Sequence, residues 1–94
     1  MKRLTCGVDL DGVLCEGKHW RSAVSVLKAK PIKEGIDMVN KYYKDYFIVI
    51  YTARQNYLMS NTLEWLNKNN VHYHAISNQK INFDYIIDDV GEPK

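Results

Sequence analysis

The sequence predicts an α/β fold built on a small parallel sheet of about four strands, in a single domain that spans residues 1–94. Three observations lead to this prediction. Short apolar stretches alternate with longer segments in which apolar residues recur at helical spacing, as they do in βαβ units. The segment 47–51 is continuously apolar, which is typical of a strand buried on both faces. A chain of 94 residues that is 46% hydrophobic and 26% charged suits one folded domain and excludes disorder.

The first half of the chain contains two expected strands and one expected helix. Residues 4–10 are a short apolar run that ends in Asp11-Gly12, which indicates a strand followed by a turn. A helix is expected from Pro31 onward, because apolar residues recur there at helical spacing and proline is tolerated at a helix start. The apolar run 47–51 is the second strand. The segment 20–30 allows either a short helix or an ordered flap.

The second half continues the alternation. Helical spacing from residue 58 to residue 66 predicts a second long helix, which Asn69 and Asn70 should close. Residues 71–76 indicate a weaker third strand, and residues 84–88 a fourth. Right-handed crossovers then place both long helices on one face of a sheet with the strand order 3-2-1-4.

The second face of this sheet is expected to be poorly covered. The return from the third strand to the fourth, residues 77–83, is short for a crossover that usually takes about a dozen residues or more. We therefore expect Ile81, Phe83 and the segment 20–30 to cover that face incompletely. Association into a homo-oligomer is expected to complete the cover.

Composition and charge exclude several classes of protein. The formal net charge of +2 is too weak to imply a nucleic-acid or membrane surface. No apolar run approaches the roughly 18 residues of a membrane span, and the N-terminal residues do not resemble a secretory signal. Cys6 and Cys15 are too few for a disulfide framework and match no metal-binding spacing. The expectation is a cytoplasmic protein with no membrane partner.

Reactive side chains gather where the expected strands end, and parallel sheets bind their ligands at the carboxyl ends of strands. Asp9 and Asp11 follow the first strand. Residues two apart in a strand point to the same side, so these two carboxylates are expected to lie close together. Their proximity favours a bound cation, or a role for one of them as an acid. Gly12 lets the backbone turn sharply towards a ligand. A plain Asp-Gly turn with solvated carboxylates is the alternative interpretation.

Three further positions carry candidate chemistry. Thr52 ends the most apolar strand, where a hydroxyl and backbone N–H groups can hold phosphate oxygens; a helix cap or an ordinary strand residue is the alternative. Arg54 opposes the dipole of the helix that follows, so an anionic partner explains it better than helix stability does, with a solvated surface arginine as the alternative. Asp88 and Asp89 follow an apolar strand, where carboxylates favour a cation such as Mg²⁺. Lys80, in a polar loop, alone indicates only solvated surface.

The cysteines and two of the histidines are weaker candidates for functional residues. Cys6 is expected in the core, and Cys15 lacks an adjacent base, so a thiol nucleophile is not expected. His72 and His74 lie on one side of the third strand without a third metal ligand at a telling spacing.

The motifs together resemble those of the haloacid dehalogenase-like (HAD) phosphohydrolases. Residues 8–14, Val-Asp-Leu-Asp-Gly-Val-Leu, match that family's first motif, DxDGx(T/V)L. The later motifs follow in order, as Thr52 in the run Tyr51-Thr52-Ala53-Arg54, then Lys80, then Asp88-Asp89. The resemblance runs from residue 9 to residue 89 and implies a minimal three-layer Rossmann-like fold of HAD type, without the fifth strand and closing helix common in relatives.

The spacing of the motifs leaves no room for the cap domain that many relatives carry. The segment between Asp11 and Thr52 has 40 residues and that between Thr52 and Lys80 has 27, and expected strands and helices fill both. A site without a cap is open, which suits a large substrate or one whose lid comes from another subunit. The expected partner is a phosphorylated small molecule, such as a sugar phosphate or nucleotide, or a phosphorylated polynucleotide end.

The resemblance implies a Mg²⁺-dependent phosphomonoester hydrolase. Asp9 would attack phosphorus and form an aspartyl-phosphate, and Asp11 would protonate the leaving oxygen and then activate water. Mg²⁺ would be held by Asp9, the Asp11 backbone carbonyl and a carboxylate of the pair, with Asp89 favoured over Asp88. Thr52 and Lys80 would hold the phosphoryl oxygens. The expected substrate-binding residues are Gly12, Thr52, Ala53, Arg54 and Lys80.

Two other functions stay open at this point. One is a phosphate-binding or phospho-accepting module with little turnover. The other is a structural or interaction protein that has inherited the site, which the presence of all four motifs argues against.

Overall fold

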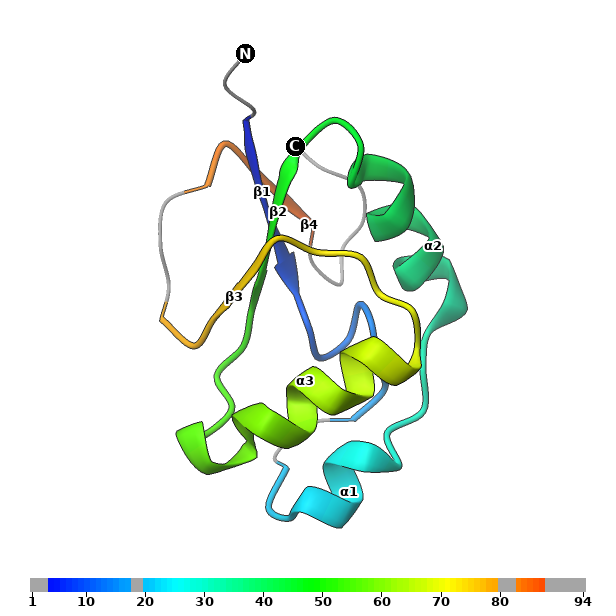
Figure 1. The fold of residues 1–94 in the computed structure, drawn as a ribbon, viewed down its shortest axis with the longest axis vertical. Helices are drawn as coiled ribbons and strands as arrows, with labels where there is room; N and C mark the ends of the chain where they lie inside the picture. The colour runs from blue at the N-terminus through cyan, green and yellow to red at the C-terminus, as the bar shows by residue number, and fades with distance from the viewer. Residues whose placement is uncertain (1–3, 18–19, 80–82, 88–94) are drawn as a thin grey trace.

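A computed structural model describes residues 4–17, 20–79 and 83–87, and these residues form the expected α/β fold (Figure 1). Its four strands are β1 (Thr5–Asp9), β2 (Phe47–Tyr51), β3 (Ala75–Ser77) and β4 (Tyr85–Ile87). All of them run parallel, in the order β3-β2-β1-β4. The predicted strand order 3-2-1-4 is therefore confirmed.

The helices are α1 (Ala23–Leu27), α2 (Lys33–Tyr42) and α3 (Met59–Lys68), with a 3₁₀ turn, η1 (Asn56–Leu58), directly before α3. The ambiguous segment 20–30 thus contains a short helix, which Ser22 and Ser25 begin with a reciprocal capping box. Asn70 closes α3 with a positive φ of 56°, as expected of an asparagine at that position. In the part of the chain that the structure describes, no helix is long and apolar enough to cross a membrane.

The third strand begins later than expected, at Ala75 rather than Val71, and ends at Ser77. After α3 the backbone N–H of Val71 still bonds to the carbonyl of Leu66. Further on, the side chain of His74 takes the place of a strand residue, because its Nδ1 accepts the backbone N–H of Ile48 at 2.9 Å. Regular pairing with β2 therefore starts only at Ala75.

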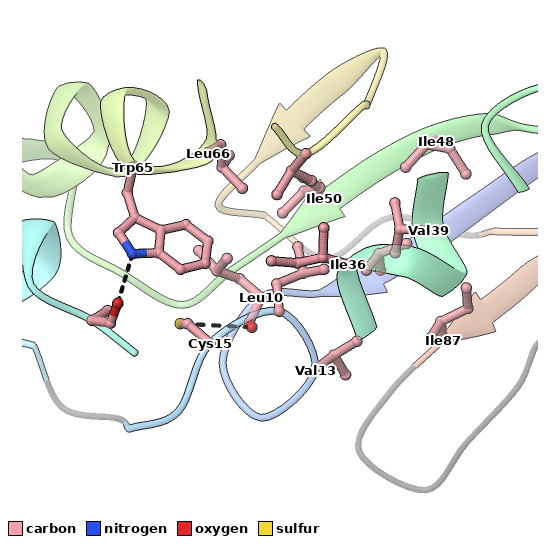
Figure 2. Close-up of a cluster of buried hydrophobic side chains, with 14 of the residues drawn as sticks. Leu10, Val13, Cys15, Ile36, Val39, Ile48, Ile50, Trp65, Leu66 and Ile87 are labelled. Atoms are coloured by element: carbon pink, nitrogen blue, oxygen red, sulfur yellow. Dashed lines mark hydrogen bonds between the residues drawn. The ribbon is translucent and has the colours of Figure 1, made fainter. Parts of the chain in front are cut away.

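The core lies between the sheet and the two long helices, on one face of the sheet (Figure 2). Alternate residues of β1 and β2 point into it and are fully buried, since Cys6 pairs with Ile48 and Val8 with Ile50. The helices and β4 contribute Ile36, Val39, Trp65, Leu66 and Ile87. As predicted, both long helices cover the same face.

The other face carries no helix among the described residues. Phe83 covers its centre: the ring lies directly over Gly7, where an added Cβ would come within 2.4 Å of it, and stacks on Tyr51 with centroids 5.5 Å apart. Phe47 and Ile86 stay 40% and 37% exposed. Of the three layers expected, the described residues thus form two.

One part of the expected cover is wrong. The segment 20–30 packs through α1 against α3 on the helical side, and the Trp65 indole N–H donates to the carbonyl of Ala29 at 2.9 Å (Figure 2). The segment is held there because it supplies the buried side chains of Val26 and Ala29. Ile81 lies outside the described residues, and association into an oligomer stays a prediction.

Candidate active site

The carboxyl ends of β1, β2 and β3 open onto a cleft of about 450 Å³. Asp9 ends β1 directly opposite Tyr51, the last residue of β2. The residues that line the cleft are Asp9, Tyr51, Thr52, Ala53, Asn78, Gln79, Phe83 and Ile86. The structure therefore brings the expected nucleophile and the expected phosphate-binding threonine to one opening.

A tight turn follows Asp9 and moves Asp11 off the strand. Gly12 has a φ of 93°, a conformation that side chains disfavour, so the predicted sharp turn is confirmed. Backbone bonds from Leu14 N–H to the Leu10 carbonyl (3.0 Å) and from Gly12 N–H to the Cys15 carbonyl (2.9 Å) hold the turn. The Ile32 N–H then bonds to the carbonyl of Leu14, which ties this turn to the start of α2.

The Asp11 carboxylate pairs with Arg54. The NH2 atom of Arg54 lies 2.8 Å from Oδ1 of Asp11, and the side chains are 3% and 22% exposed, respectively. The indole N–H of Trp20 donates to the same Oδ1 at 2.6 Å. Asp11 is not among the residues that line the cleft. β1 ends at Asp9, so its alternation does not extend to Asp11, whose carboxylate lies in the turn that follows the strand.

Arg54 is buried and bonded on several sides. Its NH1 atom donates to Oγ1 of Thr62 at 2.9 Å, and its guanidinium carbon lies 4.9 Å from the centre of the Trp20 ring. The hydroxyl of Thr62 in turn donates to the carbonyl of Leu58 within the first turn of α3. The anionic partner that the sequence called for is thus Asp11 of the same chain, and the alternative of a solvated surface arginine is excluded.

Cys15 lies beside this ion pair, with its sulfur 3.4 Å from Oδ1 of Asp11 and 3.3 Å from NH2 of Arg54. Burial, with the Asp11 charge as a smaller cause, raises the pKa of the Cys15 thiol to about 12. The thiol therefore keeps its proton at neutral pH, which agrees with the expectation that it is no nucleophile. Burial likewise raises the pKa of Cys6, a core residue as expected, to about 11.

Thr52 is 5% exposed and organises the strand-to-helix turn. Its N–H donates to the Ser77 carbonyl at 3.0 Å, and its Oγ1 accepts the backbone N–H of Arg54 at 3.1 Å. It caps no helix, because the cap of η1 is Gln55. The loop after β3 is fixed from the same side, since the Asn78 amide donates to the side chain of Asn56.

The two histidines that precede β3 have structural contacts. The His74 ring stacks between Tyr43 and Phe47, with centroid distances of 4.3 and 4.8 Å, and His72 packs edge-on against Tyr43. Within the described ranges, no three His, Cys, Asp or Glu side chains come together as a metal site.

Three expected site residues, Lys80, Asp88 and Asp89, lie outside the described residues. β4, which precedes the acidic pair, ends at Ile87, and Ile87 pairs with Val8 immediately before Asp9. β4 thus runs beside β1 up to the residue before Asp9, the expected nucleophile.

Several contacts of the site were not expected from the sequence. The alternation within β2 could have indicated Tyr51, which shares a face with the exposed Phe47. No local pattern in the sequence connects Trp20 or Thr62 to Asp11. Phe83 was expected on the second face, and its place at the cleft follows from the stack on Tyr51.

Comparison with known proteins shows the fold. No protein-family model matches the chain, and no curated protein does. A solved structure of a Pnkp1/Rnl/Hen1 complex contains a chain that matches with a TM-score of 0.69 and 17% identity over 85% of this chain, which spans 31% of that chain. A conserved protein from Bacteroides thetaiotaomicron matches with a TM-score of 0.69 and 18% identity, over 99% of this chain and 84% of that one. The chain shares its parallel α/β fold with these structures.

Proposed function

We propose that this chain is a Mg²⁺-dependent phosphomonoester hydrolase that acts through an aspartyl-phosphate. One observation carries the proposal: Asp9 and Thr52, from the first two motifs of the HAD resemblance, line the same cleft at the carboxyl ends of adjacent strands. In a parallel sheet this is the edge where ligands bind.

The reaction divides into two steps. Asp9 attacks phosphorus, the bond from phosphorus to the leaving oxygen breaks, and Asp11 gives that oxygen its proton. Asp11 then takes a proton from water, whose oxygen attacks phosphorus and releases phosphate from Asp9. Thr52 and Lys80 hold the phosphoryl oxygens, and the hydroxyl of Thr52, already an acceptor for the Arg54 N–H, has its own proton to donate.

The donor set of the cleft suits Mg²⁺. It presents the Asp9 carboxylate together with the oxygen-bearing side chains of Thr52, Asn78 and Gln79, and Mg²⁺ prefers oxygen ligands. The ion would be held by Asp9, the Asp11 backbone carbonyl and the pair Asp88-Asp89. When bound, it offsets the negative charge of the phosphoryl group.

The substrate we propose is a phosphorylated small molecule or a phosphorylated polynucleotide end. Among the described residues no cap domain lies between the motifs, so the cleft admits a large leaving group. Its wall of Tyr51, Phe83 and Ile86 offers an apolar surface to the group that carries the phosphate. The likeness to a chain of the Pnkp1/Rnl/Hen1 complex is compatible with the polynucleotide end.

A second candidate is a phospho-accepting module with little turnover. It is favoured by the Asp11 carboxylate, whose Oδ1 is bound by both Arg54 and Trp20. If those bonds also prevent the activation of water, Asp9 accepts a phosphoryl group and keeps it.

The test measures phosphate release from p-nitrophenyl phosphate with and without Mg²⁺. Asp9→Asn is expected to lower the rate at least about a thousandfold, because it removes the nucleophile. Asp45→Asn is the matched control, since Asp45 is an exposed carboxylate away from the cleft.

Three results would decide between the candidates. Metal-dependent release that Asp9→Asn abolishes supports the hydrolase. A base-labile phosphate trapped on the chain without steady release supports the module. Release that is independent of Mg²⁺, or that Asp9→Asn leaves intact, contradicts both.

A further inference from the structure

We propose that Arg54 is a positioning residue for Asp11 rather than a ligand of the substrate phosphate. In this role Arg54 and Trp20 fix the orientation of the Asp11 carboxylate by binding its Oδ1. The inference rests on the proposed function, which it deepens by naming the residues that hold Asp11 in place.

The contacts of Asp11 are unequal. Oδ1 receives NH2 of Arg54 at 2.8 Å, the Trp20 indole N–H at 2.6 Å and the Cys15 thiol at 3.4 Å. Among the described residues, the closest donor to Oδ2 is Nε of Arg54, at 3.4 Å. Three donors contact Oδ1, so the orientation of the carboxylate is fixed mainly through this oxygen.

The surroundings of Arg54 argue against direct phosphate binding. The side chain is 3% exposed. Its NH1 atom is bound to Thr62, and its guanidinium carbon lies over the Trp20 ring. Turning the guanidinium towards a phosphate would break these contacts and leave Asp11 without its cationic partner.

Trp20 and Trp65 provide a matched pair of variants. Trp20→Phe removes the indole N–H that binds Asp11 and keeps a ring beside Arg54, whereas Trp65→Phe removes the equivalent bond to the Ala29 carbonyl, away from the site. Arg54→Lys retains a positive charge without the planar fork, and Arg54→Gln removes the charge. Trp20→Phe also serves as the informative variant if Arg54→Gln fails to fold.

The experiment compares two substrates that differ in their need for an acid. Glycerol 2-phosphate loses an alkoxide that must be protonated, whereas p-nitrophenyl phosphate loses a stable phenolate. Trp20→Phe and Arg54→Gln are expected to lower kcat on glycerol 2-phosphate at least about tenfold, a part of what general acid catalysis supplies, and on p-nitrophenyl phosphate no more than about threefold. The inhibition constant of inorganic phosphate should stay unchanged, Arg54→Lys should recover part of kcat, and Trp65→Phe should show no difference between substrates.

Equal losses on both substrates, with weaker inhibition by inorganic phosphate, would identify Arg54 as a phosphate ligand and overturn the proposal. Losses in Trp65→Phe that match those in Trp20→Phe would reduce Arg54 to a structural residue. A wild-type chain without Mg²⁺-dependent turnover would instead refute the proposed function.

A second measurement needs no activity. The chain has two tryptophans, so its ¹⁵N-labelled indole groups give two N–H signals in NMR spectra. Asp11→Asn is expected to shift the signal of Trp20 and to leave that of Trp65 in place. A Trp20 signal that does not respond would show that Asp11 is not anchored in solution.

Discussion

Gly35 is the position where a single added methyl group should affect both the fold and the site. It lies buried in α2 against the turn that follows β1, and a Cβ built there would lie 1.8 Å from the carbonyl oxygen of Val13 and 2.8 Å from its carbonyl carbon. Real Cβ atoms essentially never approach another atom closer than 3.0 Å. Gly35→Ala therefore forces α2 and the turn apart by about 1.2 Å.

Two opposing effects decide how much Gly35→Ala changes the free energy of unfolding. Alanine in place of glycine favours a helix by about 1 kcal/mol. Overpacking typically costs about 1–3 kcal/mol when side chains can adjust, and here the obstacle is backbone, which lies in a turn fixed by its own hydrogen bonds. We expect a net loss of roughly 2 kcal/mol or more in the free energy of unfolding. The displaced turn carries Asp11, so phosphatase activity should fall as well.

Urea unfolding followed by circular dichroism measures the loss. Glu34→Ala is the control, because it changes an exposed neighbour in the same helix and should cost no more than about 1 kcal/mol. If Gly35→Ala is as stable as the wild type, or more stable, helix propensity outweighs the contact and the close approach of α2 to the turn is not present in solution.

Two further outcomes are expected. Ile50→Ala should lower the free energy of unfolding by about 2–5 kcal/mol, because Ile50 is fully buried between the sheet and the helices, whereas Leu63→Ala, at a position 39% exposed, should cost far less; equal losses in urea titrations would contradict the described core. Stability should also fall as the pH rises above 9. The pKa values of Cys6 and Cys15 are raised from 9.0 to about 11 and about 12, so the unfolded chain loses these protons first, and the stability present below pH 9 declines by up to about 1.4 kcal/mol per pH unit for each thiol. Cys6→Ala should reduce this slope in unfolding curves taken from pH 8 to 11, and a slope unchanged by Cys6→Ala would exclude that thiol as a source.

The sheet could be predicted from the sequence because the rules that determine the order of its strands are local or topological. Continuous apolar runs indicate buried strands, and right-handed crossovers leave one order for two βαβ units. The expected start of β3 was too early because the side chain of His74, rather than a backbone carbonyl, accepts the backbone N–H of Ile48 in β2. No hydrophobic pattern indicates such a bond.

The same distinction applies to the candidate site. Asp9, Gly12 and Thr52 could be predicted as site residues because each lies at or just after the end of an expected strand. The pairing of Asp11 with Arg54 joins residues 43 positions apart, and their contact depends on the turn at Gly12 and on the packing of α3. Charge alone could not identify the partner, since the chain has 13 lysines and arginines.

The place of β1 has a consequence for how the chain becomes functional during synthesis. β1 is the first strand made, yet it lies inside the sheet between β2 and β4, both of which come later in the chain. The hydrogen bonds of Thr5 to the Asp84 carboxylate span 79 positions, and contacts between distant residues form slowly because a long loop must close first. The strand that ends in Asp9 therefore leaves the ribosome long before its neighbours exist. Because Ile86 of β4 lines the cleft together with Asp9, the cleft is complete only after β4 has been made.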